Sequence, residues 1–398
     1  KAFDFSSYPL RKIALKFCYS GWAYNGLAIQ ADATPLPTVE GVLFDALAKA
    51  RLIDPDAGFE GCGWERCGRT DRGVSAGGQV VSLWVRSALD NPPHSYTLIL
   101  NRILPSTIRI LAWSPVASTF SARFACKSRH YKYFFSPDGL DIRRMSEAAS
   151  LLVGGHDFRN FCKLDPAKQL TTYRRQILSA TISPVAGGDT DTGMHVLDLQ
   201  GSAFLYHQVR HIMAVLFLVG TGLEAPSVVT ALLNVEAGAE GDPALEVVDC
   251  RPVYQMADAL PLMLYACHYS PGDVEWQAED ETEVDAAGVL APSGAGLYHQ
   301  LQVVHARSEM YAALNHEFLC AAAAHHAPPP PHFPVTVTGF VPDGKRLMNV
   351  PLGGGMFQRT AKYLPLLERI RGDHFEVVNE RWRLGRGAKR DERRKAAE

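Results

Sequence analysis

The sequence predicts an α+β protein built from two tandem β-α-β-β-α-β halves, the arrangement of two ferredoxin-like units in a row. Segments in which apolar and polar side chains alternate indicate strands, and they are interspersed with segments of helical periodicity. The order of these segments in the first part of the chain is then repeated in the next part. Two sheets meeting in this way would leave a cleft between them, which is a natural place for a substrate.

The first half contains four predicted strands and two predicted helices. Apolar and polar side chains alternate along Ile13–Ser20, as in a strand with one buried face. Thr38–Ile53 has apolar residues at helical spacing, and Thr38 is a suitable N-cap. The other predicted elements are a strand near Phe59–Trp64, a strand over Gln79–Arg86, a helix over Ser95–Leu104 and a strand over Ile108–Val116.

The second half repeats this order. The aromatic, alternating segment Arg129–Ser136 predicts its first strand, and the strongly apolar segment Tyr206–Val219 predicts its second helix. The remaining predicted elements are a helix over Asp141–Val153 and strands over Gln176–Val185, His195–Phe204 and Leu262–Tyr269.

These elements predict three regions. Residues 8–121 form an N-terminal α+β domain that carries the loop around Asp71, residues 122–271 form a second α+β domain, and residues 272–398 form an extension. The extension is predicted to contain an acidic stretch (Val274–Val289), helices over Leu297–Leu319 and Thr360–Trp382, an Ala/His/Pro linker (Ala321–Pro331) and a charged, disordered tail (Gly385–Glu398).

The composition is that of a globular protein without a membrane span. The chain has 398 residues, of which 47% are hydrophobic, yet it contains no apolar run of the roughly 18 residues that a membrane helix needs. Its eight cysteines are scattered and form no C-x-x-C pair, which favours reduced thiols in a reducing compartment. The closest pair, Cys62 and Cys67, has no matching second pair, so no zinc site is predicted. We expect the protein to be located in the cytoplasm or the nucleus, and an organelle stays an alternative.

The charge is distributed unevenly although the formal net charge is only −2. Residues 1–137 carry 16 Lys and Arg against 10 Asp and Glu, whereas residues 235–285 carry one Arg against 13 acids. A basic N-terminal part would attract phosphates, and the acidic stretch would offset its positive charge in the net charge of the chain. Two solvated faces of opposite sign explain the same counts.

The most distinctive segment is Cys67–Ala76, in which Asp71 lies between Arg69 and Arg72 and is flanked by glycines. Glycines allow close approach to a ligand, and neighbouring guanidinium groups favour the ionised carboxylate. If the predicted cleft binds RNA, an ionised carboxylate in it repels the phosphates. Nucleophilic catalysis is one function that would explain an acid at this position. A P-loop is not favoured because its lysine is missing. A tight turn capped by Asp71 stays an alternative.

The segment His207–His211 resembles the zinc-binding helix of metalloproteases but has Gln208 where the catalytic glutamate would be. Without that general base a metalloprotease is not favoured. A half-buried helix with hydrogen-bonded histidines is the plain alternative. We favour the interpretation that Arg210 points from this helix into the cleft and pairs with Asp71, because a guanidinium fixes a carboxylate in one orientation.

The strand Arg129–Phe135 interleaves basic and aromatic side chains. Alternation places Tyr131 and Tyr133 on one face, and His130 and Lys132 on the other. Such a strand is suited to base stacking and phosphate contacts, although ordinary strand propensity explains the composition equally well.

Taken together, these segments resemble the TruA family of tRNA pseudouridine synthases. The resemblance covers about Arg11 to Ser270 and rests on three motifs in the family's order, namely Gly68–Val74, Phe120–Arg123 with Arg129–Tyr133, and Gly201–Leu205 with Val209–Met213. It implies a pseudouridine synthase fold with a central cleft, no cofactor and no metal. It further implies that the protein is a homodimer.

The same resemblance implies roles for four residues. Asp71 takes the position of the nucleophile, Tyr131 that of the active-site tyrosine and Arg210 that of the salt-bridge arginine. Arg69 would occupy the space that a flipped-out base leaves. Asp71 would either attack the sugar covalently or remove a sugar proton.

The motif Gly21–Gln30, the extension after residue 271, and Ser75-Ala76 where many bacterial members have His are similar to the eukaryotic branch, which modifies tRNA positions 38 and 39. The resemblance therefore implies a uridine in the anticodon stem-loop as the substrate. Two other classes stay open, a catalytically silent tRNA-binding module and a structural subunit of a ribonucleoprotein. The trio Asp71, Tyr131 and Arg210 argues against a mere binder, which gains nothing from an acid facing phosphates.

Overall fold

The computed structural model describes residues 3–30, 32–87, 95–185, 193–278, 296–326, 348–360, 362–389 and 392. The chain folds into two compact units. Unit 1 consists of Lys1–Lys127 and Met263–Pro330, and unit 2 consists of Ser128–Leu262 and Pro331–Glu398. Both units combine a mainly antiparallel arrangement of strands with helices, which confirms the predicted α+β class.

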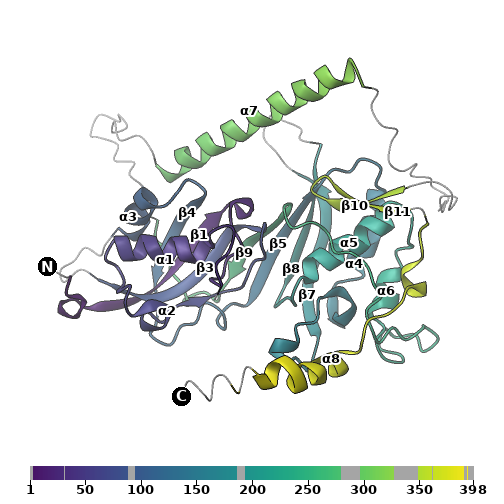
Figure 1. Ribbon diagram of the computed structural model, residues 1–398, viewed down its shortest axis with the longest axis horizontal. Coiled ribbons are helices and arrows are strands. Elements are labelled where there is room, and N and C mark those ends of the chain that lie inside the picture. The colour runs from purple at the N-terminus through teal and green to yellow at the C-terminus, as the bar shows by residue number, and fades with distance from the viewer. Residues whose placement is uncertain are drawn as a thin grey trace. The chain divides into compact units, whose positions relative to one another are not determined.

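Unit 1 is built on a sheet with the strand order β4-β1-β3-β9, and β2 also pairs with β3 (Figure 1). β1 runs antiparallel to both β3 and β4, whereas β9 runs parallel to β3. The strands are β1 (Leu10–Tyr19), β2 (Glu65–Arg66), β3 (Ser75–Arg86), β4 (Ile108–Pro115) and β9 (Leu262–His268). The helices are α1 (Val39–Lys49), α2 (Gly58–Gly61), α3 (Tyr96–Ile103) and α7 (Leu297–Ala323).

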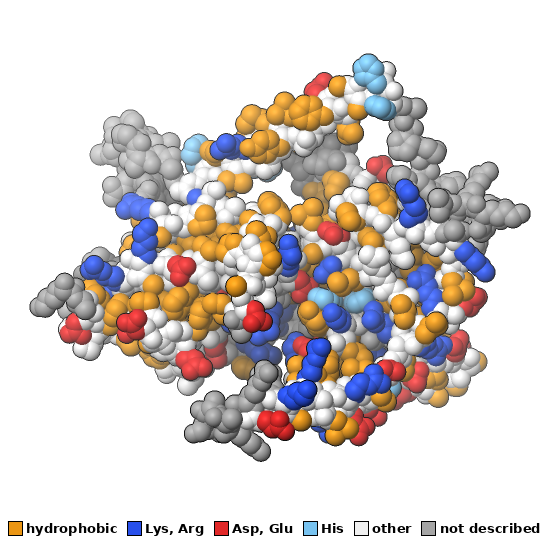
Figure 2. All heavy atoms as spheres, in the orientation of Figure 1, with side chains coloured by type: hydrophobic (Ala, Val, Ile, Leu, Met, Phe, Trp, Pro, Cys, Tyr) orange, Lys and Arg blue, Asp and Glu red, His pale blue; other side chains and the backbone are white. Residues whose placement is uncertain are grey.

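The core of unit 1 follows from the predicted periodicity. Ile13, Leu15 and Phe17 of β1 are completely buried, as are Leu43 and Leu47 of α1. α1 begins after Thr38, as predicted, because the Thr38 hydroxyl accepts a hydrogen bond from the Gly41 N–H (3.2 Å). α7 differs from the other long helices because none of its residues is buried. Figure 2 shows apolar side chains along it.

Unit 2 is built on an antiparallel sheet with the strand order β5-β8-β7-β6. α4 packs against α5 and β7, and α5 also contacts β10. The strands are β5 (Ser128–Phe135), β6 (Gly154–Asp157), β7 (Arg174–Pro184), β8 (His195–Gly201) and the hairpin of β10 (Met348–Gly353) and β11 (Met356–Thr360). The helices are α4 (Ile142–Ser150), α5 (Gln208–Gly220), α6 (Val228–Leu233) and α8 (Phe375–Trp382).

Two predicted elements differ from the structure. The strand predicted near Phe59–Trp64 forms directly after it, as β2 (Glu65–Arg66), because α2 and a turn occupy Phe59–Trp64 and Phe59 stacks on Phe44 of α1 with ring centroids 4.4 Å apart. Thr360–Trp382 is not one helix. Only Leu366–Glu368 and Phe375–Trp382 are helical. Pro365 lies within the predicted helix, and proline breaks a helix because it lacks a backbone N–H.

The extension follows the prediction in part. The predicted helix over Leu297–Leu319 forms and continues to Ala323, because alanine favours helix, so the Ala/His/Pro linker does not begin at Ala321. The tail was predicted to be disordered, but Arg383–Gly387 forms a π-helical turn. The rest of the linker, most of the acidic stretch and the end of the tail lie outside the described residues. No helix in the described part of the chain is long and apolar enough to cross a membrane.

Candidate active site

The segment with Asp71 forms a tight loop between β2 and β3 of unit 1. The Cys67 N–H donates to the Val80 carbonyl (2.8 Å) where the loop begins, and the Val74 N–H donates to the Asp71 carbonyl (3.1 Å) where it ends. Gly73 has a φ of 85°, which a residue with a side chain rarely adopts. Arg69 is exposed and Asp71 is half-buried. Because a strand follows the loop and a P-loop leads into a helix, the geometry also argues against a P-loop.

Hydrogen bonds from three other segments hold this loop. The Tyr19 and Thr70 hydroxyls bond to each other at 2.6 Å, and the Leu27 N–H donates to the Thr70 carbonyl at 3.2 Å. The Gln79 side-chain amide donates to the Gly68 carbonyl at 3.0 Å. Thr70, directly before Asp71, is therefore fixed from two sides, so the position of the carboxylate is restricted.

Two glycines of the segment Gly21–Gln30 lie directly against the loop. A Cβ added to Gly21 would lie 2.1 Å from the Val74 carbonyl oxygen. A Cβ added to Gly26, whose φ is +88°, would lie 3.1 Å from the Thr70 carbonyl oxygen and 3.3 Å from the Arg72 nitrogen. Since Cβ atoms essentially never approach below 3.0 Å, the loop would have to move if Gly21 were replaced.

Arg210 has a special position in unit 2. Every other residue of α5 is buried, so this helix presents one guanidinium and otherwise belongs to the core. The Arg210 Nε donates to the Ala257 carbonyl at 2.8 Å, and the Ala257 N–H donates back to the Arg210 carbonyl at 3.1 Å. The Nε atom of Arg210 is thus anchored, which is suited to holding the guanidinium in one direction.

Tyr131 lies on the buried face of β5, as the alternation predicted. Its ring is 9% exposed and meets the Phe204 ring edge to face, with centroids 4.9 Å apart. On the other face, His130 and Lys132 both contact Asp198 of β8, at 2.7 and 3.1 Å. His130 and Lys132 therefore share one carboxylate partner within the strand pair.

The two histidines of the His207–His211 segment do not share a helix. His207 precedes α5 and has a φ of 62°, a strained conformation for a residue with a side chain. His211 is buried within α5, and its ring contacts the Tyr254 ring edge to face. Burial and the nearby positive charge of Arg251 lower the pKa of His211 to about 2. A zinc-binding helix of the metalloprotease kind is therefore absent here.

Comparisons with known proteins agree with these motifs. Residues 148–270 match a family model described as tRNA pseudouridine synthase. The chain is 46% identical over 288 residues to tRNA pseudouridine(38/39) synthase of Saccharomyces cerevisiae, covering 70% of this chain and 61% of that protein. It is 42% identical to the human protein of the same name, covering 71% and 60%. It is also 35% identical to tRNA pseudouridine synthase A of Methanothrix thermoacetophila, covering 70% of this chain and 90% of that protein.

The chain belongs to the TruA family of tRNA pseudouridine synthases. It spans about three fifths of the length of its yeast and human relatives. The part that matches the TruA family model contains Arg210, whereas Arg69, Asp71 and Tyr131 precede it. The roles of all four residues stay predictions.

The four predicted site residues of this TruA family member are divided between the units. Arg69 and Asp71 share one loop of unit 1, and Tyr131 and Arg210 lie on β5 and α5 of unit 2. The predicted ion pair between Arg210 and Asp71 joins residues of different units and stays a prediction.

Sequence reasoning missed the residues that hold the loop. Tyr19 and Gln79 are on predicted strands, but nothing in the strand pattern indicated that they bond to the Asp71 loop. Gly21 and Gly26 did belong to a quoted motif, and two close glycines in a short segment were a signal for close backbone approach.

Proposed function

We propose that this protein isomerises uridine to pseudouridine in the anticodon stem-loop of tRNA, at position 38 or 39. Two things support the proposal: the membership of the chain in the TruA family, and the names of its yeast and human relatives, both tRNA pseudouridine(38/39) synthases. The observation that carries it is the Asp71 loop, in which Asp71 lies between two arginines and hydrogen bonds to Thr70 and Gly68 hold the loop around it. A module that only binds RNA has no need for an acid fixed in this way.

The reaction is a rearrangement without net oxidation or reduction. The bond between C1′ of the ribose and N1 of the uracil breaks, and a bond between C1′ and C5 forms. The proton on C5 is lost to a base, and N1 gains a proton. Because atoms and electrons balance within the uridine, no cofactor, metal or ATP is required. Asp71 would act at the sugar, either by covalent attack on C1′ or by removing a sugar proton.

The other site residues would handle the base. A uridine within the stem must leave the stack, which costs a few kcal/mol. Arg69 is exposed beside Asp71 and would fill the vacated space. Tyr131 would stack on the extruded uracil, and Arg210 would pair with Asp71 and orient it.

Three larger-scale features belong to the same proposal. The two halves would be tandem ferredoxin-like domains over residues 8–121 and 122–271, with residues 272–398 as an extension. In unit 1, the order β4-β1-β3-β2 with antiparallel neighbours agrees with that topology. The protein would be a homodimer in the cytoplasm or nucleus.

The test is pseudouridine mapping on unmodified tRNA with the wild-type protein and with Asp71→Asn. Asparagine keeps the size of the side chain but neither attacks as a carboxylate nor takes a proton. We expect wild type to form pseudouridine at position 38 or 39 and Asp71→Asn to form none, with tRNA binding largely retained. The matched control is Asp45→Asn on the exposed face of α1, which should keep full activity.

Other outcomes would separate the parts of the proposal. Pseudouridine at other positions would keep the chemistry and contradict the site within tRNA. Full activity in Asp71→Asn would remove Asp71 from the mechanism. Tight tRNA binding with no product from wild type would point to a silent binding module.

A further inference from the structure

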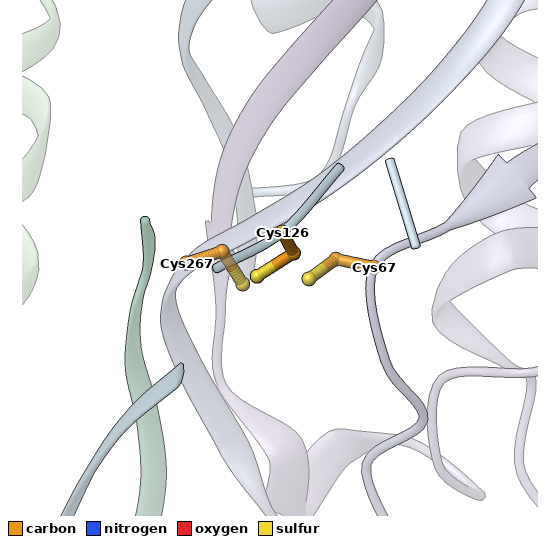
Figure 3. A group of neighbouring side chains, drawn as sticks. All are labelled: Cys67, Cys126 and Cys267. Carbon is orange, nitrogen blue, oxygen red and sulfur yellow. The ribbon is translucent and has the colours of Figure 1, made fainter. Parts of the chain in front are cut away.

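Three cysteines that are far apart in the sequence converge in unit 1. The sulfur atoms of Cys67, Cys126 and Cys267 all lie within 4.8 Å of one another, and Figure 3 shows them pointing toward a common centre. The three residues are only 1%, 9% and 8% exposed. No disulfide involves them. Among the described residues, this is the cluster whose ligand atoms are close enough for a metal ion.

Backbone hydrogen bonds fix the three positions. The Cys67 N–H donates to the Val80 carbonyl at 2.8 Å, which ties the start of the Asp71 loop to β3. The Lys127 N–H donates to the His268 carbonyl at 2.8 Å, so the residues next to Cys126 and Cys267 are joined to each other. β9, which carries Cys267, pairs in parallel with β3. The sulfur atoms therefore converge on a scaffold that exists before any ligand binds.

The surroundings of the cluster are apolar and enclosed. The Tyr269 ring packs against the Phe120 ring, and its hydroxyl donates to the Ala122 carbonyl at 2.7 Å. A metal ion binds cysteine as the thiolate, so metal binding at this cluster would replace the thiol protons.

We propose that Cys67, Cys126 and Cys267 bind one zinc ion through their thiolates, at the start of the loop that carries Asp71. Binding would release three thiol protons for each Zn²⁺, which leaves three Zn–S bonds and a fourth position for water. With Zn–S bonds of about 2.3 Å, tetrahedral sulfur ligands lie about 3.8 Å apart, so the cluster needs to contract only slightly.

The zinc ion would join three parts of unit 1. It would connect the loop start at Cys67, the segment after β4 at Cys126 and β9 at Cys267. Cys67 lies four residues before Asp71, so the ion would stabilise the loop without touching a substrate. A ligand that binds only the folded state raises stability by mass action.

The experiment measures bound metal in the chain of residues 1–398. Protein purified without chelators and dialysed against Zn²⁺ is analysed by mass spectrometry of the metals. We expect one zinc per wild-type chain and a loss of at least tenfold in zinc retention for Cys126→Ser and Cys267→Ser. Cys62→Ser is the matched control, since Cys62 is also buried in unit 1 but lies outside the cluster, and it should retain one zinc.

A second measurement is independent of whether the variants fold. Wild-type protein loaded with Co²⁺ in place of zinc should show the intense near-ultraviolet absorption of thiolate-to-cobalt charge transfer. Wild type that retains no zinc and shows no such absorption would overturn the proposal. So would zinc retention that is equal in Cys267→Ser and wild type, or a disulfide between two of the three cysteines in freshly purified protein. None of these readouts depends on pseudouridine formation.

Discussion

At the residue scale, the distance between Gly26 and the Asp71 loop determines what a single methyl group would do. We predict that Gly26→Ala lowers the rate of pseudouridine formation about 10- to 100-fold, because small displacements of a catalytic group have effects of that size. The added Cβ would meet the Thr70 carbonyl oxygen at 3.1 Å. Single-turnover kinetics with unmodified tRNA provide the measurement.

The matched control for this prediction is Gly58→Ala. Gly58 also has a positive φ, of +63°, but a Cβ there would meet nothing within 4 Å. Both variants carry similar backbone strain, and only Gly26→Ala presses on the loop. Equal rates in the two variants would show that strain, and not displacement of the loop, is what matters.

Also at the residue scale, His211 links stability to pH. Its pKa is about 2 in the folded protein because burial disfavours the charged ring, against 6.5 for an ordinary histidine. Between these values the unfolded chain binds a proton that the folded chain does not, so stability falls as the pH falls. From pH 7 to pH 5 the loss is about 2 kcal/mol.

Urea unfolding of wild type and His211→Leu at pH 7 and pH 5 measures this contribution. We expect the difference in unfolding free energy between the two pH values to be smaller in His211→Leu by about 2 kcal/mol. An identical pH dependence in both proteins would contradict the folded-state assignment of a neutral ring. Comparing each protein with itself removes the cost of the altered packing.

At the element scale, α1 depends on its first residues. The Thr38 hydroxyl caps the helix through the Gly41 N–H, and we predict that Thr38→Ala lowers the free energy of unfolding by about 1 kcal/mol. Ser95 occupies the same position before α3 but makes no side-chain capping bond, so Ser95→Ala should cost much less. Chemical denaturation of both variants tests the prediction, and similar losses would argue against the cap.

The same helix contains Glu40, and the sequence of the helix did not indicate that this carboxylate is buried. Glu40 is completely buried and accepts hydrogen bonds from Trp64 (2.8 Å), from the Ile29 N–H (3.1 Å) and from Arg66. By helix periodicity alone, an acid in a first turn is a favourable neighbour of the helix dipole and stays in solvent. The carboxylate is buried because Arg66 and Trp64 of another segment meet it there.

At the scale of the whole molecule, α5 and α7 differ in burial: α5 is almost completely buried, and no residue of α7 is buried. Phe217 of α5 is 1% exposed, whereas Phe318 of α7 is 66% exposed. We predict that Phe217→Ala lowers the free energy of unfolding by about 3–5 kcal/mol and that Phe318→Ala changes it by less than about 0.5 kcal/mol. Urea denaturation measures both. A large loss in Phe318→Ala would mean that α7 is packed in solution.

Local periodicity and motif by themselves determined most elements and the Asp71 loop of this protein. β1, α1, β3, α3 and β4 lie within a few residues of their predicted positions. The spacing of apolar residues predicts these elements, although β3 is buried on both faces. The same local reasoning failed at Phe59–Trp64, where Phe59 packs on α1 and the chain turns helical. It did predict the strand β9, as Leu262–Tyr269, but not its pairing with β3, which lies nearly 200 residues earlier.

Only the tertiary structure decided which distant side chains meet. It left Arg210 as the one residue of α5 that is not buried, fixed Thr70 against Tyr19, and brought together three cysteines whose spacing predicted no metal site. A contact between residues far apart in the chain leaves no local periodicity, because it depends on how sheets and loops close in space. The sequence therefore determined most of the elements and predicted the residues of the site, and the fold determined which groups support the Asp71 loop.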